Sequence, residues 1–284
     1  MDTQMQLLPA LLQYSIGNRK ITIINDSFFI AGESYFTHLP ENGVGQILRK
    51  NFRSDTPTLT TSIFIIEGEG QLPILIDTGM GDRFAPDMQG RLLEALPLLG
   101  LSPDQIGTIL LTHLHGDHFY GLVSQGGSKN FPNARIWFSD AEYDYWINNK
   151  DLSPADQDNA VAIKQALALY ERLQPAANEL LPGITSVALP GHTPGHTGFL
   201  LESQAEKILF CGDILTIPAV QAAMPEIGFA TDVNYSEAVR TRIDVLKKAA
   251  HERLLLAGPH FEFPCLSYVK IDGDGFQLIP KQQI

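Results

Sequence analysis

Two short histidine-rich stretches constrain the fold of this chain more than any other feature. Residues 113–118 read HLHGDH and residues 191–196 read GHTPGH, and together they hold five of the eight histidines. The first stretch directly follows the apolar segment 108–112, which is typical of a buried strand. Side chains at the end of a rigid strand can be aimed into a cleft, and imidazole with carboxylate is a donor set that suits Zn²⁺ and similar ions. The fold must therefore bring these two distant stretches together.

The first stretch alone offers ligands for more than one ion. His113 and His115 are two residues apart and can chelate a single ion, while Asp117 and His118 can turn toward a second. Gly116 leaves the backbone free to make that reversal. The alternative of loop histidines without a ligand role fits poorly, because three histidines and one aspartate within six residues form a specific pattern.

Three more candidate donors follow apolar segments further along the chain. His192 lies in a turn that two prolines stiffen, Asp213 closes a Cys-Gly-Asp segment, and His260 follows Gly-Pro. By itself Asp213 would be a turn-forming aspartate, and His260 would be a buried histidine with a hydrogen-bond partner. Beside the first stretch both become candidate ligands, and the two carboxylate oxygens of Asp213 could bridge two ions.

The overall charge limits the classes of partner. The formal net charge is −12, from 32 acidic and 20 basic residues. Nucleic acids and anionic membranes require a basic patch, so we expect neither as a partner and expect a small-molecule substrate. The two cysteines are too few for a disulfide framework. The sequence shows no long apolar segment and no signal-like start, which predicts a cytoplasmic protein.

No linker, charge block or repeat divides the chain, so we expect one domain over residues 1–284 with a peripheral N-terminal arm of about residues 1–20. Segments rich in branched and aromatic residues predict strands at 20–24, 62–67, 73–76, 108–112, 135–138, 184–189, 199–201, 207–211, 253–257 and 268–271. A capping box at Ser139 and Glu142 predicts a helix over 143–149, Ser153-Pro154 predicts one to about 173, and Asn234 with Glu237 predicts one to about 252. This order indicates a layered α/β fold with the sheets inside.

The two histidine stretches, the CGD segment at 211–213 and the GPH segment at 258–260 resemble the motifs of the metallo-β-lactamase-fold hydrolases. The resemblance implies a four-layer αββα sandwich with a binuclear site along one edge of its two sheets. It implies two divalent ions, with zinc expected and iron, manganese or cobalt as alternatives, because several metals accept imidazole and carboxylate donors.

The resemblance also implies a role for each candidate residue. One ion would be held by His113, His115 and His192, the other by Asp117, His118 and His260, and Asp213 would bridge them. His196 and Asp77 correspond to positions outside the ligand set, where side chains orient ligands and support the site.

From about residue 76 onward the chain is similar, within this superfamily, to the methyl parathion hydrolases and their lactonase relatives. Phe84 and Trp146 resemble positions of the aromatic substrate pocket in these enzymes, although both could instead fill the core. By analogy, a homodimer is a candidate assembly.

The expected reaction follows from the metal chemistry. Two ions can share a hydroxide, because coordination lowers the pKa of water to about 7, and Asp117 could carry the proton to the leaving group. The scarcity of Lys and Arg near the motifs favours a small neutral ester, either a lactone or an organophosphate triester. A glyoxalase II-like thioesterase, a β-lactamase and a non-catalytic metal-binding protein remain alternatives.

Overall fold

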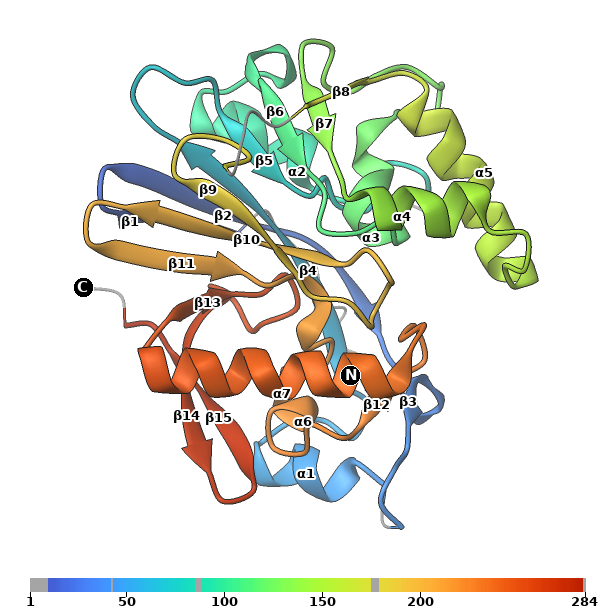
Figure 1. Ribbon diagram of the computed structural model, residues 1–284, viewed down its shortest axis with the longest axis vertical. Coiled ribbons are helices and arrows are strands. Elements are labelled where there is room, and N and C mark those ends of the chain that lie inside the picture. The colour runs from blue at the N-terminus through green and yellow to red at the C-terminus, as the bar shows by residue number, and fades with distance from the viewer. Residues whose placement is uncertain (1–9, 42, 85–87, 175–178, 283–284) are drawn as a thin grey trace, which may run out of the picture.

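The computed structural model describes residues 10–41, 43–84, 88–174 and 179–282. Over these ranges the strands form a seven-stranded sheet in the order β1-β2-β4-β5-β6-β7-β8, a six-stranded sheet in the order β15-β14-β13-β11-β10-β9, and a small sheet of β3 and β12. Figure 1 shows the two large sheets in the middle of the molecule, with α7 on one side and α2 to α5 on the other.

The bounds of the elements are as follows. The seven-stranded sheet consists of β1 (Ala10–Ile16), β2 (Arg19–Ile30), β4 (Thr58–Glu67), β5 (Ile74–Ile76), β6 (Thr108–Leu110), β7 (Arg135–Trp137) and β8 (Glu171–Arg172). The six-stranded sheet consists of β9 (Ile184–Ala188), β10 (Thr197–Ser203), β11 (Glu206–Phe210), β13 (Leu255–Ala257), β14 (Leu266–Asp272) and β15 (Gly275–Pro280), and the small sheet pairs β3 (Phe36–Thr37) with β12 (Gly228–Phe229). The helices are α1 (Gly45–Lys50), α2 (Leu92–Ala95), α3 (Gly116–Phe119), α4 (Asp140–Tyr143), α5 (Pro154–Leu167), α6 (Pro218–Gln221) and α7 (Tyr235–Glu252).

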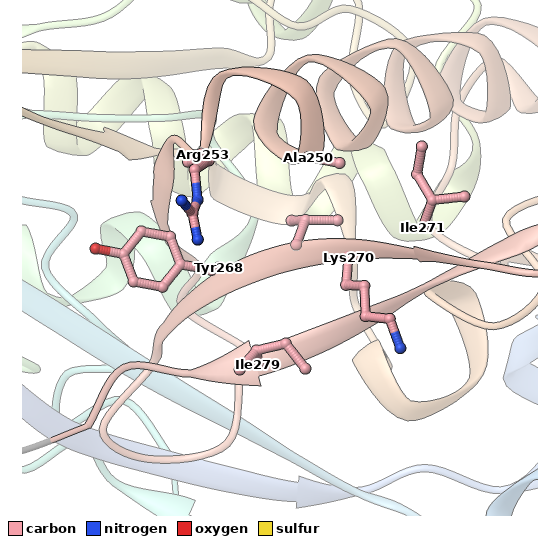
Figure 2. Close-up of a pocket in the computed structure, with 7 residues that line it drawn as sticks. Ala250, Arg253, Tyr268, Lys270, Ile271 and Ile279 are labelled. Atoms are coloured by element: carbon pink, nitrogen blue, oxygen red, sulfur yellow. The ribbon is translucent and has the colours of Figure 1, made fainter.

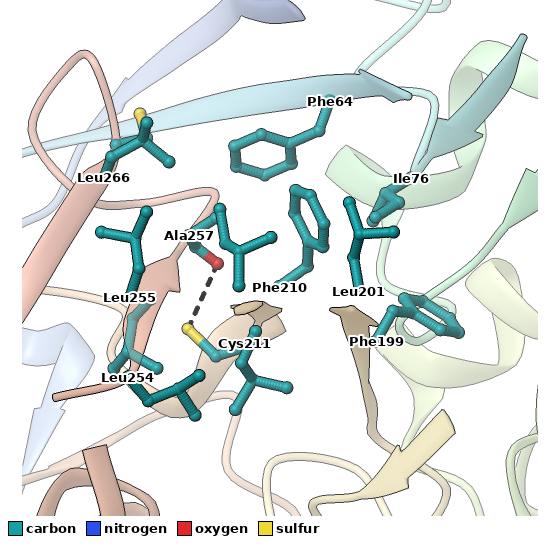
Figure 3. Close-up of a cluster of buried hydrophobic side chains, with 14 of the residues drawn as sticks. Phe64, Ile76, Phe199, Leu201, Phe210, Cys211, Leu254, Leu255, Ala257 and Leu266 are labelled. Atoms are coloured by element: carbon teal, nitrogen blue, oxygen red, sulfur yellow. Dashed lines mark hydrogen bonds between the residues drawn. The ribbon is translucent and has the colours of Figure 1, made fainter. Parts of the chain in front are cut away.

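Strand β4 shows why the sheets stack in layers. Its side chains alternate between the two faces of the sheet, so a strand that is covered on both faces reads as a continuous apolar run. Ile63 and Ile65 pack with residues of α2 and α5, whereas Phe64 and Ile66 pack with residues of β10 and β11. The rings of Phe64 and Phe210 meet between the sheets with centroids 5.1 Å apart (Figure 3). The predicted αββα sandwich is confirmed.

The outer layer on the six-stranded sheet is α7. Leu246 and Ala249 of this helix are buried in the same core cluster as β13 and β14. The side chain of Asn234 accepts a hydrogen bond from the Glu237 backbone N–H at the start of the helix, as the sequence predicted. None of the helices in the described ranges is long and apolar enough to cross a lipid bilayer.

Two local predictions were wrong. The second predicted helix ends at Leu167 rather than near residue 173, because residues 171 and 172 pair with β7 and the N–H of Leu173 donates to Ile136. The predicted capping box is only half formed. Ser139 accepts from the Glu142 N–H, but the Glu142 carboxylate turns inward and accepts from the N–H of Leu114 instead.

The N-terminal arm and the strand directions complete the frame of the site. Residues 1–9 of the expected arm lie outside the described residues, and β1 is the edge strand of its sheet, paired with β2. Strands β5, β6 and β7 are parallel to one another, as are β11 and β13. Parallel strands release their following loops at a common edge of the sheet, which is where the candidate metal donors follow.

Candidate metal centre

The seven predicted ligands come from four places in the chain, and the structure brings them together. The loop after β6 and helix α3 carry His113, His115, Asp117 and His118, the loop between β9 and β10 carries His192, and the loops after β11 and β13 carry Asp213 and His260. Their donor atoms form three overlapping groups, each within 4.8 Å, namely His113 with His115 and His192, His113 with His118 and Asp213, and Asp117 with His118 and His260.

The first group consists of three imidazoles whose nitrogens converge. His115 Nδ1 lies 3.0 Å from His113 Nε2 and 2.9 Å from His192 Nε2. The other ring nitrogens have outer partners, because His113 Nδ1 lies 3.1 Å from Thr112 Oγ1 and His192 Nδ1 lies 2.9 Å from Asp232 Oδ1. Where an outer nitrogen carries the proton, the inner nitrogen presents a lone pair. Lone pairs this close repel one another unless a cation or proton lies between them.

The group of Asp117, His118 and His260 has the same design, with a carboxylate added. His118 donates from Nδ1 to Asp77 at 2.8 Å, and His260 donates from Nδ1 to the Thr60 carbonyl at 2.8 Å. Their Nε2 atoms face Asp117, at 3.5 and 3.8 Å respectively. Asp117 is the most solvent-exposed donor of this group, since its side chain is 20% exposed and the two histidines are buried.

Asp213 lies between the two groups and contacts both. Its Oδ2 is 3.3 Å from His192 Nε2 and 2.9 Å from His260 Nε2, and its Oδ1 is 3.3 Å from His118 Nε2. A carboxylate in this position can give one oxygen to each of two ions.

The protonation states of His113, His115 and Asp213 suit metal binding. Burial lowers the pKa of His113 well below its ordinary value and lowers that of His115 to about 3. Burial acts to raise the pKa of Asp213, but His260, His118 and His113 outweigh it and hold that pKa well below its ordinary value. Neutral imidazoles and an ionised carboxylate are the forms that coordinate a divalent cation. For His118 and His260, burial acts to lower the pKa, but Asp213 and Asp117 outweigh it and raise the pKa above the ordinary value, so these imidazoles would release a proton when a metal binds.

Two buried atoms of the cluster support the fit with a metal. His118 Nε2 and Asp213 Oδ1 have no hydrogen-bond partner among the described residues. A buried polar atom without a partner is costly. Both atoms face the gap between the donor groups, where coordination to a divalent ion would satisfy them.

His196 and Asp77 lie where they support ligands. His196 donates from Nδ1 to the Leu189 carbonyl and accepts at Nε2 from the Asp213 N–H, both at 2.8 Å, so neither nitrogen is free. Gly212 allows this contact, because a Cβ there would lie 2.3 Å from His196 Nε2. Asp77 accepts from His118 and also from the Thr112 N–H and hydroxyl.

Sequence reasoning missed two supporting acids. Asp232 orients His192, and it is held in turn by the Phe229 N–H and by the buried side chain of Arg242. Glu142 was interpreted only as part of a capping box. A solitary acid carries no recognisable spacing, so no sequence pattern could have identified either contact.

A cavity of about 910 Å³ opens over the donor groups and includes His115 and Asp117 among its lining residues. Phe84 lines it and is 39% exposed. Trp146 does not line it, and the expectation of a substrate contact there is corrected, because the side chain is 1% exposed and packs beneath His115 with ring centroids 5.6 Å apart.

A second cavity of similar size, about 830 Å³, lies away from these residues. Figure 2 shows it between the end of α7 and strands β14 and β15, with Arg253, Tyr268 and Lys270 at its sides. None of the candidate metal donors lines it. The first cavity is therefore the one that places a small molecule beside the donor groups.

Comparison with known proteins agrees with this geometry. The family model of the metallo-beta-lactamase superfamily matches residues 56–257. The N-acyl homoserine lactonase of Bacillus cereus is 26% identical over 211 residues, which cover 65% of this chain and 76% of that protein.

Two solved structures match nearly the whole chain. The dizinc quorum-quenching lactonase AidC, in complex with a product, N-hexanoyl-L-homoserine, superposes with a TM-score of 0.90 at 26% identity, covering 98% of this chain and 99% of the other. The hydrolase AbOPH of the beta lactamase superfamily superposes with a TM-score of 0.88 at 30% identity, covering 98% and 100%. With a family model that matches most of its length and this arrangement of donors, the chain belongs to the metallo-beta-lactamase superfamily.

Proposed function

We propose that this metal-dependent hydrolase holds two divalent ions and opens lactones of the acyl homoserine type. The observation that carries the proposal is the cavity over the two donor groups, whose lining combines aromatic and apolar side chains with no Lys or Arg among the described residues. The likeness to a dizinc lactonase over almost the whole chain supports the same reading.

The donor groups divide naturally between two ions. His113, His115 and His192 would hold one ion, Asp117, His118 and His260 the other, and Asp213 would bridge them. Two ions bound in this way lower the pKa of water and polarise the substrate oxygen that gains charge, so hydrolysis needs no protein nucleophile. Zinc suits this donor set, although iron, manganese and cobalt accept it too.

Asp117 is placed to move a proton as well as to bind. Its Oδ2 accepts a hydrogen bond from the Thr61 hydroxyl at 2.9 Å, which holds the carboxylate toward the cavity. Burial acts to raise its pKa, but His118 and His260 outweigh burial and keep the pKa below its ordinary value. The carboxylate is therefore ionised, and its position beside the cavity is what would let it carry a proton to the leaving alkoxide of an opened lactone.

The charge of the cavity favours neutral substrates. Asp151 and Asp156 are among its lining residues, and Phe84 and Tyr145 add aromatic faces. A free carboxylate on the substrate, as in a glutathione thioester or a β-lactam, would meet these acids without a Lys or Arg to pair with in the described lining. An acyl homoserine lactone is uncharged and brings an apolar chain.

An organophosphate triester is the second candidate. It is also uncharged, and an aryl leaving group could pack against Phe84 and Tyr120, whose ring centroids lie 5.6 Å apart beside the cavity. The same site would then hydrolyse a phosphoester bond instead of the ester bond of a lactone.

Hydrolysis of a substrate panel tests the proposal. We expect N-hexanoyl homoserine lactone to be hydrolysed, the activity to disappear with a chelator and to return with Zn²⁺, and methyl parathion to react more slowly. A glutathione thioester and a chromogenic cephalosporin serve as anionic comparators. Metal-dependent turnover of the anionic substrates alone, or of no ester at all, would reject the assignment.

A further inference from the structure

The short segment that joins His113 to His115 is held from both sides by side chains of the helical layer. The N–H of Leu114 donates to Glu142 Oε1 at 2.9 Å, and the carbonyl of Leu114 accepts from Asn159 Nδ2 at 3.0 Å. Both peptide groups between the two histidines therefore have a fixed partner. The backbone that carries two of the expected ligands cannot rotate without breaking one of these hydrogen bonds.

The same carboxylate also reaches the loop that carries His192. Glu142 Oε2 accepts from the Thr193 hydroxyl at 2.6 Å, and Thr193 directly follows His192. The loop packs tightly on the start of α4, because a Cβ on Gly195 would lie 2.1 Å from the Glu142 nitrogen. One side chain thus ties together two loops that come from different sheets.

Glu142 also fixes the packing beneath His115. Its Oε1 accepts from Trp146 Nε1 at 2.7 Å, and the Trp146 ring packs edge-on to the His115 ring. The side chain of Glu142 is fully buried. No ion pair joins it to a Lys or Arg within the described ranges.

A buried carboxylate without a cation is costly unless hydrogen bonds compensate for it. Here the three compensating donors all belong to the surroundings of His113, His115 and His192. A structural acid elsewhere in the core would not need this particular set of partners, and an apolar side chain would fill the space at lower cost.

We propose that Glu142 is a positioning residue that holds these three histidines in the geometry that binds one of the two ions. The inference rests on the binuclear site of the proposed function. It assigns the effect to one ion only, because the hydrogen bonds of the Glu142 side chain go to Leu114, Trp146 and Thr193 and none goes to His118, Asp117 or His260 in the described part of the chain.

Titration of the metal-free protein with Zn²⁺ or Co²⁺ tests this inference without any substrate. We expect Glu142→Ala to weaken binding of one ion by about tenfold or more, as supporting residues of metal sites commonly do, while the affinity for the second ion stays unchanged. Thr193→Val removes only the contact to the second loop at nearly constant volume, and it should weaken the same ion. Glu142→Gln keeps an acceptor for Leu114 and Trp146, so its loss of affinity for that ion should be smaller.

Two further variants make the result specific. Ser139→Ala removes the helix cap, which is the hydrogen bond from the Glu142 N–H, and the hydrogen bond to the Gly195 carbonyl, but it leaves the hydrogen bonds of the Glu142 side chain. It should therefore lower thermal stability without selective loss of one ion. In a His260→Ala background, which lacks a donor of the other group, Thr193→Val should still weaken the remaining ion.

The failures are distinguishable. Wild-type protein that binds no divalent ion would overturn the proposed function together with this inference. Wild-type protein that binds two ions, while Glu142→Ala and Thr193→Val bind both with wild-type affinity or lose both equally, would overturn this inference alone. If Glu142→Ala fails to fold, the metal affinities of Thr193→Val and Glu142→Gln decide whether the inference holds.

Discussion

Among single residues, Asp213 and His196 lie side by side but relate differently to the expected ions. Asp213 presents its carboxylate to both donor groups, and one of its oxygens has no hydrogen-bond partner in the described part of the chain. Both ring nitrogens of His196 are already used by the backbone. We therefore expect the first to bind metal and the second to hold the Asp213 backbone in place.

Substitution of the two residues should separate these roles. Asp213→Ala removes the carboxylate that contacts both groups and leaves His118 and His260 without it, so we expect the variant to retain neither ion after gel filtration. His196→Ala should keep most of its metal, since it removes an orienting contact and no donor. Elemental analysis measures the number of metal ions per chain, and His251→Ala, at an exposed histidine, serves as the control. Two ions per chain in Asp213→Ala would contradict the bridging role.

The sequence predicted which candidate donors converge and two of their supports, Asp77 and His196, but missed two other supports. All seven candidate ligands could be chosen because each follows an apolar strand, and such strand ends converge in this fold. Asp232 and Glu142 could not be chosen, because their partners are brought together only by tertiary packing. Trp146 was assigned to the wrong environment for the same reason, since its spacing says nothing about whether it faces the cavity or the core.

At the scale of elements, a β-bulge in β2 connects three segments. The pairing of β2 with β4 skips one position between Asn25 and Ser27. The extra residue, Asp26, accepts hydrogen bonds from the N–H groups of Met80, Arg91 and Leu92, so it joins the loop after β5 to the start of α2. Burial raises its pKa to about 6, although these amide donors act to lower it.

This raised pKa predicts how stability changes with pH. The folded state holds the Asp26 proton more tightly than the unfolded state, whose pKa is about 3.9. The resulting stabilisation is complete below that value and is lost as the pH rises through about 6, by at most about 3 kcal/mol. Asp26→Asn cannot titrate at this position. In urea unfolding of the metal-free proteins, the free energy of unfolding of the variant relative to that of the wild type should therefore be higher at pH 7.5 than at pH 4.5. Parallel pH profiles would contradict the assignment.

Strongly apolar strands were predictable, whereas the two-residue strands and the less apolar edge strands β1 and β15 were not. The predicted strands within β2, β4 and β11 were confirmed, as was the start of α7 at its asparagine cap. The two-residue strands β3, β8 and β12 escaped detection, because two residues carry no periodicity and their pairing depends on the partner strand. The predicted helix at residue 154 was extended too far for that reason.

For the whole molecule, the layers could be anticipated but the cavity could not. Strands without strict alternation with helices indicated internal sheets, and the family resemblance supplied the number of layers. The cavity is lined by segments far apart in the chain, among them Tyr145 of the π-helical turn Asp144–Asn148 and Val233 before α7, and no local pattern encodes that these segments meet there. The single domain, the homodimer and the cytoplasmic location stay predictions, since the fold and the relatives do not test them.

The position of the donors predicts how metal removal affects the molecule as a whole. His113 and His118 extend from the seven-stranded sheet, whereas His192, Asp213 and His260 extend from the six-stranded sheet. Bound ions would therefore link the two halves of the sandwich. They would also offset converging carboxylates in a chain whose net charge is −12. Because the unfolded chain does not preserve this geometry, metal binding should stabilise the folded state directly.

Thermal unfolding with and without a chelator measures this link. At free Zn²⁺ about 1,000-fold above its dissociation constant, binding adds about 4 kcal/mol, which for a chain of this size corresponds to a Tm difference of about 10 °C. Zn²⁺ should restore the Tm, and Mg²⁺ at the same concentration should not, since Mg²⁺ prefers oxygen donors and this site is mainly imidazole. Asp213→Ala should unfold at one temperature in both conditions. If the chelator lowered the Tm of Asp213→Ala as much as that of the wild type, the stabilising ions would bind elsewhere. The link between the two sheets through Asp213 would then contribute nothing to stability.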